Sequence, residues 1–305
     1  MRHLVASLAF LAFTAPALAE VPRVVATTKP VHSLVAAVMG DLGTPDLIVK
    51  GAASPHTYSL RPSDAANLEA ADVVFWTGHG LELFLEDSIE TLAPNATIVA
   101  LSANPAIELL PVRQGGAFEP HDDGDEAEHH DDHGEKDMHF WLDPVNATFM
   151  VSQIADTLSA ADPAHTDTYF ANARAEVARL QKLIADTGAK LAPVKDKPFI
   201  VFHDAYQYFE RRFGLSVAGS ITITPDTLPG AQRIGALHAK VAAAGAACVF
   251  AEPQFEPAVV NTIIEGTPAK AGTLDPEGAG LTESPDLYAE LITGLADSLV
   301  ACLGQ

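Results

Sequence analysis

Three histidines and one aspartate stand at positions where they could bind a transition metal together. His56, His203 and Asp275 each follow a predicted strand, and His139 precedes a predicted helix. Ligands of open α/β sheets bind at the carboxyl ends of the strands, so these side chains are expected near one another. Three neutral imidazoles plus a carboxylate or a water give the four-coordinate shell that suits Zn²⁺. The four residues are far apart in the chain and match no local zinc motif.

A second group of histidines lies in an acidic segment, EPHDDGDEAEHHDDHGEKD, at residues 119–137. This segment contains His121, His129, His130 and His133 among many carboxylates. It has no large apolar residue, so it cannot bury enough surface to offset the entropy of ordering. We expect a mobile loop whose imidazoles and carboxylates bind divalent metal with low affinity. The alternative is a solvated acidic loop with incidental histidines.

The charge of the whole chain also favours cations as partners. It has 18 Lys and Arg against 40 Asp and Glu, a formal net charge of −22. Such a charge repels nucleic acid and anionic lipid. The alternative explanation is solubility alone.

The N-terminus has the pattern of a secretory signal peptide. Arg2 and His3 precede an apolar run at residues 4–15, and the small-residue site Ala-Leu-Ala ends at Ala19. The apolar run is too short to span a bilayer. We expect cleavage near Ala19/Glu20 and a mature protein outside the cytoplasm.

Two cysteines, Cys248 and Cys302, occur late in the chain. In an oxidising compartment an isolated pair favours one disulfide. A pair of buried thiols is the alternative.

Short β-rich runs alternate with amphipathic helical stretches in both halves of the chain. The predicted strands are residues 24–28, 47–49, 73–76, 97–101, 199–202, 217–220, 248–251 and 269–274. The predicted helices are residues 30–39, 63–71, 81–92, 205–213, 234–244, 257–264 and 285–302. This alternation predicts an α/β fold with mostly parallel sheets and helices on both faces.

Between the two halves lies one long helical pattern, which begins after Asp162 and runs to about Leu191. We therefore expect two lobes with mostly parallel sheets joined by one long rigid helix, with the metal site in the cleft between the lobes. The N-terminal lobe is expected at residues 20–161, the linking helix at 162–192 and the C-terminal lobe at 193–305.

Three segments resemble the metal-ligand segments of the metal-binding components of zinc and manganese ABC importers. They are PHTYSLRPSD at residues 55–64, HFWLDP at residues 139–144 and VFHDAY at residues 201–206. The resemblance covers essentially the whole mature chain. The acidic His-rich segment, the run CVFAEPQFEP at residues 248–257 and the two cysteines resemble the zinc-specific, ZnuA-like branch.

This resemblance implies that His56, His139 and His203 bind the metal. In some relatives an acidic residue directly precedes the first ligand histidine, but here that residue is Pro55. Asp275 matches a carboxylate of the manganese branch, so we expect Asp275, or a water that it holds, to complete the shell. Glu252 is expected to orient one ligand ring from outside the shell.

The implied function is that of a periplasmic solute-binding protein, not an enzyme, that carries Zn²⁺ as its transported ligand. Its expected partners are a membrane permease and a cytoplasmic ATPase, and we expect a monomer that neither inserts in the membrane nor binds nucleic acid. One alternative is a manganese-binding importer component of the same family. Another is a zinc-dependent metallohydrolase, although the chain contains neither His-Glu-x-x-His nor Gly-x-Ser-x-Gly. A third is an adhesin that needs no metal cleft.

Overall fold

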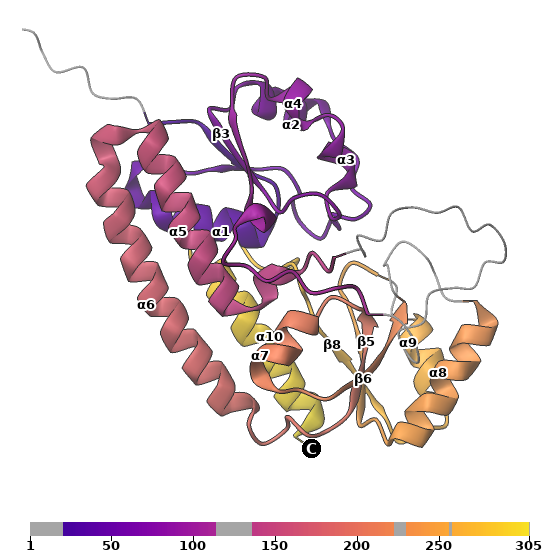
Figure 1. The fold of residues 1–305 in the computed structure, drawn as a ribbon. Helices are drawn as coiled ribbons and strands as arrows, with labels where there is room; N and C mark the ends of the chain where they lie inside the picture. The colour runs from indigo at the N-terminus through magenta and orange to yellow at the C-terminus, as the bar shows by residue number, and fades with distance from the viewer. Residues whose placement is uncertain (1–20, 114–135, 223–229, 256–257, 305) are drawn as a thin grey trace, which may run out of the picture.

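The first half of the chain builds a parallel four-stranded sheet (Figure 1). The computed structural model describes residues 21–113, 136–222, 230–255 and 258–304. The strands of this sheet are β1 (Val24–Ala26), β2 (Asp46–Leu47), β3 (Val73–Trp76) and β4 (Thr97–Ala100), in the order β2-β1-β3-β4. The two inner strands, β1 and β3, are continuous apolar runs and are fully buried, as expected when helices cover both faces of a parallel sheet.

The second half of the chain builds another parallel four-stranded sheet. Its strands are β5 (Phe199–His203), β6 (Val217–Thr222), β7 (Cys248–Ala251) and β8 (Lys270–Thr273), in the order β6-β5-β7-β8. The inner strands β5 and β7 are again buried along their whole length. The predicted α/β fold with two parallel sheets is therefore confirmed.

Helices connect the strands and cover the sheets. They are α1 (Lys29–Met39), α2 (Pro62–Glu69), α3 (Leu83–Glu86), α4 (Ile89–Leu92), α5 (Pro144–Ala161), α6 (Thr166–Leu191), α7 (Gln207–Phe213), α8 (Ala231–Ala244), α9 (Ala258–Ile264) and α10 (Leu287–Leu303). Prolines stand in the first turns of α1, α2 and α5, where a missing N–H breaks no helical hydrogen bond. Asp143 caps α5 by accepting a hydrogen bond from the backbone N–H of Val145, so the predicted cap is present.

The helix predicted over residues 81–92 is wrong, because the structure has two short helices, α3 and α4, in its place. The side chain of Glu82 is fully buried and accepts hydrogen bonds from the backbone N–H groups of Thr77 and Gly78. A buried carboxylate must keep such partners, and here they hold residue 82 outside the helix.

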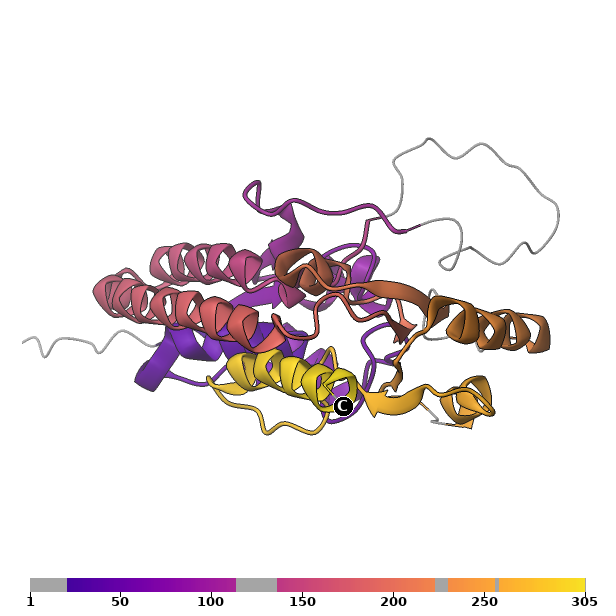
Figure 2. The same ribbon diagram turned by 90° about the horizontal axis from the view of Figure 1, so that it is seen from below.

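The long helix α6 was predicted, and the helix predicted after Asp143 is the 18-residue α5, which packs beside it. Helix α6 runs along one side of the molecule past both sheets, and α5 lies beside its upper part (Figure 1). Helix α10 packs against α6 and α1. Figure 2, a view from below, shows α10 beside α6. The largest apolar core contains residues from both sheets as well as from these helices, including Phe75, Leu180, Phe250 and Leu295. The two lobes therefore share a core in addition to the linking helix.

A disulfide between Cys248 and Cys302 ties β7 to α10. The two Cα atoms lie 6.3 Å apart and the residues are 54 positions apart in the chain. Of the two alternatives that the sequence left open, the disulfide is confirmed.

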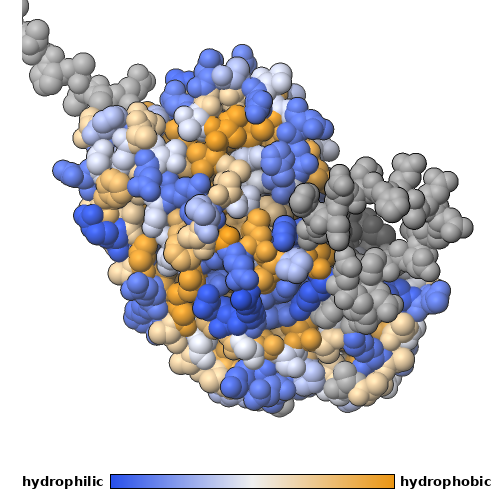
Figure 3. All heavy atoms as spheres, in the orientation of Figure 1, coloured by the Kyte–Doolittle hydropathy of each residue, from blue (hydrophilic) through white to orange (hydrophobic). Residues whose placement is uncertain are grey.

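The surface is mixed in character. On the face drawn in Figure 3, hydrophilic residues are spread over both lobes with apolar areas between them. Among the described residues, Leu83 is the large apolar side chain that stays exposed, at 62%. None of the described helices is long and apolar enough to cross a membrane.

Candidate metal centre

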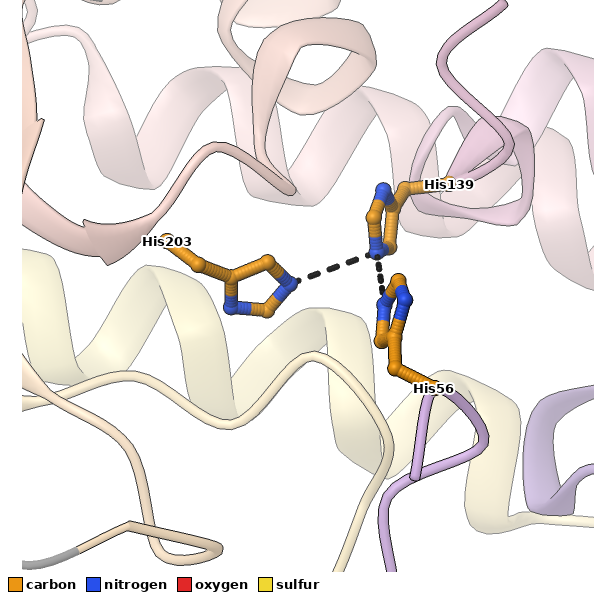
Figure 4. Close-up of side chains that lie close together, drawn as sticks. All are labelled: His56, His139 and His203. Atoms are coloured by element: carbon orange, nitrogen blue, oxygen red, sulfur yellow. Dashed lines mark hydrogen bonds between the residues drawn. The ribbon is translucent and has the colours of Figure 1, made fainter. Parts of the chain in front are cut away.

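Three histidine rings meet between the two sheets. His203 is the last residue of β5, His56 lies in the loop that follows β2, and His139 directly precedes the short 3-10 turn that leads into α5. Figure 4 shows the three rings pointing toward one another from separate segments. One ligand atom from each ring can be chosen so that all three lie within 4.8 Å of one another. The structure therefore brings together the three histidines that the sequence analysis selected.

The Nε2 atoms are spaced as ligands of a single metal ion are spaced. Nε2 of His139 lies 3.1 Å from Nε2 of His56 and 3.3 Å from Nε2 of His203. Two nitrogens bound to one Zn²⁺ at about 2.0–2.1 Å with tetrahedral angles lie about 3.3 Å apart. These two distances therefore match those between ligand nitrogens of a zinc site.

His203 is held by the carboxylate of Glu252, which follows the neighbouring strand β7. Nδ1 of His203 lies 2.8 Å from Oε1 and 2.7 Å from Oε2 of Glu252, and Tyr206 donates a hydrogen bond to Oε1 at 3.1 Å. A carboxylate only accepts hydrogen bonds, so Nδ1 of His203 carries the proton. In the neutral ring the lone pair then lies on Nε2, which faces the other histidines.

The charge of Glu252 also changes the proton affinity of His203. Burial lowers the pKa of His203, but the charge and hydrogen bond of Glu252, together with the charges of Asp204 and Asp137, outweigh burial, and the pKa is raised overall. The pKa of Tyr206 is raised well above its ordinary value by burial and then by Glu252 and Asp275, so its hydroxyl stays a donor.

His139 has a similar partner, Asp137, which the sequence analysis assigned to the mobile acidic loop. Asp137 is buried, with 5% of its surface exposed, and its Oδ1 lies 2.8 Å from Nδ1 of His139. The ring of His139 therefore also presents Nε2 to the centre. The signal in the sequence was an acidic residue two positions before a ligand histidine, but it was hidden within a run of acidic residues.

His56 is the least constrained of the three. Within the described part of the chain no carboxylate is hydrogen-bonded to its ring, and its backbone N–H donates to Oγ of Ser54 at 3.3 Å. Burial, followed by the charges of His139 and His203, lowers the pKa of His56 well below its ordinary value. The ring therefore stays neutral, and able to bind a metal, at lower pH than a free histidine.

Asp275 lies outside this group of ligand atoms. Its Oδ1 accepts hydrogen bonds from the backbone N–H groups of Glu277 at 3.1 Å and Gly278 at 2.9 Å, and from Nε2 of Gln254 at 3.2 Å. The structure thus gives Asp275 a role in holding the turn after β8, close enough to the site for its charge to act on Tyr206.

The remaining histidines fall into two sets. His3, His121, His129, His130 and His133 lie outside the described residues. The second set is described but does not join the three rings, and it comprises His32, His79, His165 and His238.

Comparisons with known proteins show the family of this chain. The family described as "Zinc-uptake complex component A periplasmic" (ZnuA) matches residues 24–302. The "High-affinity zinc uptake system protein ZnuA" of Brucella suis biovar 1 (strain 1330) is 50% identical over an alignment of 323 positions. The alignment covers 97% of each chain. The protein of the same name from Paracoccus denitrificans (strain Pd 1222) is 38% identical and covers 95% of this chain and 94% of its own.

Solved structures agree on the fold. The "Crystal structure of ZnuA" is similar with a TM-score of 0.77 at 24% identity, over 92% of this chain and 99% of that one. With the family matched from one end of the described residues nearly to the other, this chain belongs to the zinc-uptake complex component A family.

Proposed function

We propose that this chain captures Zn²⁺ in the periplasm and delivers it to an ABC importer. Nε2 atoms of His56, His139 and His203 are the proposed ligands. The observation that carries the proposal is the convergence of these three atoms at 3.1 and 3.3 Å. The relatives from Brucella and Paracoccus are named for high-affinity zinc uptake, which supports the choice of cargo.

Binding without catalysis is the proposed role, because the relatives are named for zinc uptake. The rings of His139 and His203 are already turned so that Nε2 faces the centre, because Asp137 and Glu252 accept from Nδ1. Such outer partners raise the basicity of a ligand ring and fix its orientation. The ion is cargo, so the protein's task is to hold it and then release it.

Asp275 is our proposed source of the fourth ligand, through a water that it holds. Its Oδ1 is engaged by Gln254, Glu277 and Gly278. Its Oδ2 accepts no hydrogen bond within the described part of the chain, so this oxygen is available to a water. Zn²⁺ with three protein ligands and a water is a common four-coordinate arrangement.

We assign the acidic segment at residues 119–137 a supporting role. His121, His129, His130 and His133 supply imidazoles for weak accessory binding. The net charge of −22 attracts cations toward the protein before they reach the tight site.

Export and delivery complete the proposal. The N-terminal segment is removed near Ala19/Glu20, and the mature monomer docks on a permease driven by a cytoplasmic ATPase. The lobes are assigned to residues 20–161 and 193–305, with residues 162–192 as the link between them.

The test uses the chain expressed with its own N-terminal segment and collected from the periplasm. Mass spectrometry of the N-terminus checks the cleavage site. Zn²⁺ and Mn²⁺ are then titrated in competition, on the intact protein and on a variant that lacks residues 119–135 but keeps Lys136 and Asp137.

One tight Zn²⁺ per chain that survives the deletion, with weaker sites lost, is the expected result. A preference for Mn²⁺ would change the assigned cargo. Loss of all tight binding on deletion would contradict the three-histidine site and leave the acidic segment as the binder.

A further inference from the structure

We propose that Asp137 is a positioning residue for the ligand His139, and that helix α7 holds Asp137 in place for this task. The inference rests on the proposed function, because it concerns the same zinc site. It gives a specific role to a residue at the very end of the acidic segment, which by composition alone would be solvated.

One oxygen of Asp137 makes both contacts to His139. Oδ1 accepts hydrogen bonds from the backbone N–H of His139 at 3.0 Å and from ring Nδ1 at 2.8 Å. The first contact fixes the carboxylate against the main chain, and the second fixes the ring against the carboxylate. Together they set both the tautomer of His139 and the direction in which Nε2 points.

Two further polar atoms of Asp137 are fixed by the opposite lobe. Oδ2 accepts a hydrogen bond from Nε2 of Gln207 at 3.2 Å, and the backbone oxygen accepts one from the hydroxyl of Tyr208 at 2.7 Å. Both donors lie in the first turn of α7. With 5% of its surface exposed, Asp137 has little freedom to rotate away from His139.

Further contacts join the last residues of the acidic segment, Lys136 and Asp137, to Leu110 and Pro111, which precede the segment; these four residues form its base. The backbone N–H of Asp137 donates to the oxygen of Leu110 at 2.9 Å, and Pro111 and Lys136 form an antiparallel bridge. The Tyr208 hydroxyl also accepts from the N–H of Leu110 at 2.8 Å, so it joins both sides of this base. The acidic segment is thus attached to the protein by the residue that orients a ligand ring.

The short stretch at residues 206–208 serves both outer carboxylates. Tyr206 donates to Glu252, the partner of His203, and Gln207 donates to Asp137, the partner of His139. His203 lies three positions before Tyr206 in the chain. The start of α7 therefore aligns two ligand rings that come from different parts of the fold.

Zinc affinity of the mature chain, measured by chelator competition, tests this role. Asp137→Ala is expected to weaken zinc binding by about 10- to 100-fold, the usual cost of losing an outer partner. Asp137→Asn keeps an accepting oxygen and should recover part of the affinity. Gln207→Ala should cost less than Asp137→Ala and add little to it in the double variant, because it acts through the same carboxylate.

Asp162→Asn is the matched control. Asp162 is also a buried aspartate, 4% exposed, and it pairs with Nδ1 of His165 at 2.6 Å outside the three-histidine group. It should lower stability but leave zinc affinity unchanged. Two-bond ¹H–¹⁵N spectra of the apo protein provide a second readout, in which Asp137→Ala should shift His139 from the Nδ1–H tautomer to a mixture.

Two deletions sharpen the test. Removing residues 119–135 should leave tight binding intact, whereas removing residues 119–137 should weaken it as strongly as Asp137→Ala. Equal affinities of the two deletions, or an equal loss of affinity in Asp162→Asn, would overturn the inference. If His139→Ala abolishes tight binding but Asp137→Ala leaves it unchanged, the role of Asp137 is overturned and the proposed function stands. If tight binding survives His139→Ala, the proposed function itself is overturned.

Discussion

Nδ1 of His203 lies 2.7 Å from Oε2 of Glu252, although 49 residues separate them in the chain. The pairing arises because β5 and β7 are adjacent parallel strands, and each of these residues stands at the carboxyl end of its strand. The sheet therefore delivers a ligand ring and the carboxylate that orients it to the same place.

This pair sets the expected pH dependence of zinc binding. The raised pKa of His203 means that protons begin to compete with zinc above the ordinary histidine pKa of 6.5, while the lowered pKa of His56 keeps that ring neutral in more acid solution. Affinity should fall as the pH drops from 7.5 to 5, by about tenfold per pH unit once His203 protonates. Competition titrations at several pH values measure this slope, and a flat profile would rule out imidazole ligation.

Glu252→Gln separates the two effects of the carboxylate within that experiment. The amide lacks the charge that raises the pKa of His203, so the onset of proton competition should move to lower pH. Affinity at neutral pH should also fall by about 10- to 100-fold.

Zinc should stabilise the folded protein by an amount that grows with the logarithm of the free zinc concentration above the Kd. At a free zinc concentration 100 times the Kd, the gain is about 2.7 kcal/mol, seen as a rise in Tm that a chelator reverses. His203→Ala should abolish the rise, whereas His238→Ala, which changes a histidine outside the group, should preserve it. A rise that persists in His203→Ala would place the stabilising ion elsewhere.

The disulfide should contribute strongly to stability. Closing a loop between residues 54 positions apart stabilises by about 4 kcal/mol in the chain-entropy treatment. Replacing Cys248 and Cys302 together by Ala should lower the urea midpoint accordingly, and a reductant should have no further effect on that variant. Zinc affinity should not change, since neither sulfur belongs to the metal group.

Lys29 should be important for joining the lobes. Its buried Nζ donates to the backbone oxygens of Gly278 at 3.1 Å, Ala279 at 3.2 Å and Leu281 at 2.9 Å, and so links α1 to the segment after β8. Lys29→Met should lower the free energy of unfolding by about 2–4 kcal/mol, because hydrogen bonds to a charged donor are lost.

A matched control for Lys29→Met is Lys182→Met, which removes an exposed ion pair with Asp186. It should change the free energy of unfolding by no more than about 0.5 kcal/mol. Equal effects of the two substitutions in urea titrations would contradict the role of Lys29.

Asp275→Asn tests the proposed fourth ligand. The amide oxygen can still accept the N–H groups of Glu277 and Gly278, so the turn should be retained. The lost charge should weaken zinc binding by about tenfold, as expected for an indirect partner of the metal. Unchanged affinity, with the fold intact by circular dichroism, would remove Asp275 from the site.

Much of the fold was predictable because its signals are local. The strands β3 and β7 coincide with the predicted apolar runs at residues 73–76 and 248–251. The start of α5 was marked by the cap Asp143 followed by proline. The start of α3 at Leu83 was not predictable, because Glu82, directly before it, turns inward to reach residues of another segment, Thr27 among them.

The sequence by itself determined the kinds of ligand and the segments that carry them: three histidines beside apolar runs, an acidic His-rich segment and a pair of cysteines. Only the tertiary structure decided that Nε2 of each ring faces the centre, that Asp137 belongs to the site and that Asp275 stays outside the ligand group. The physical reason is range. Strand and helix patterns arise from neighbours in the chain, whereas the orientation of a ligand ring depends on partners such as Glu252 and Gln207, which packing of the two lobes brings from distant segments.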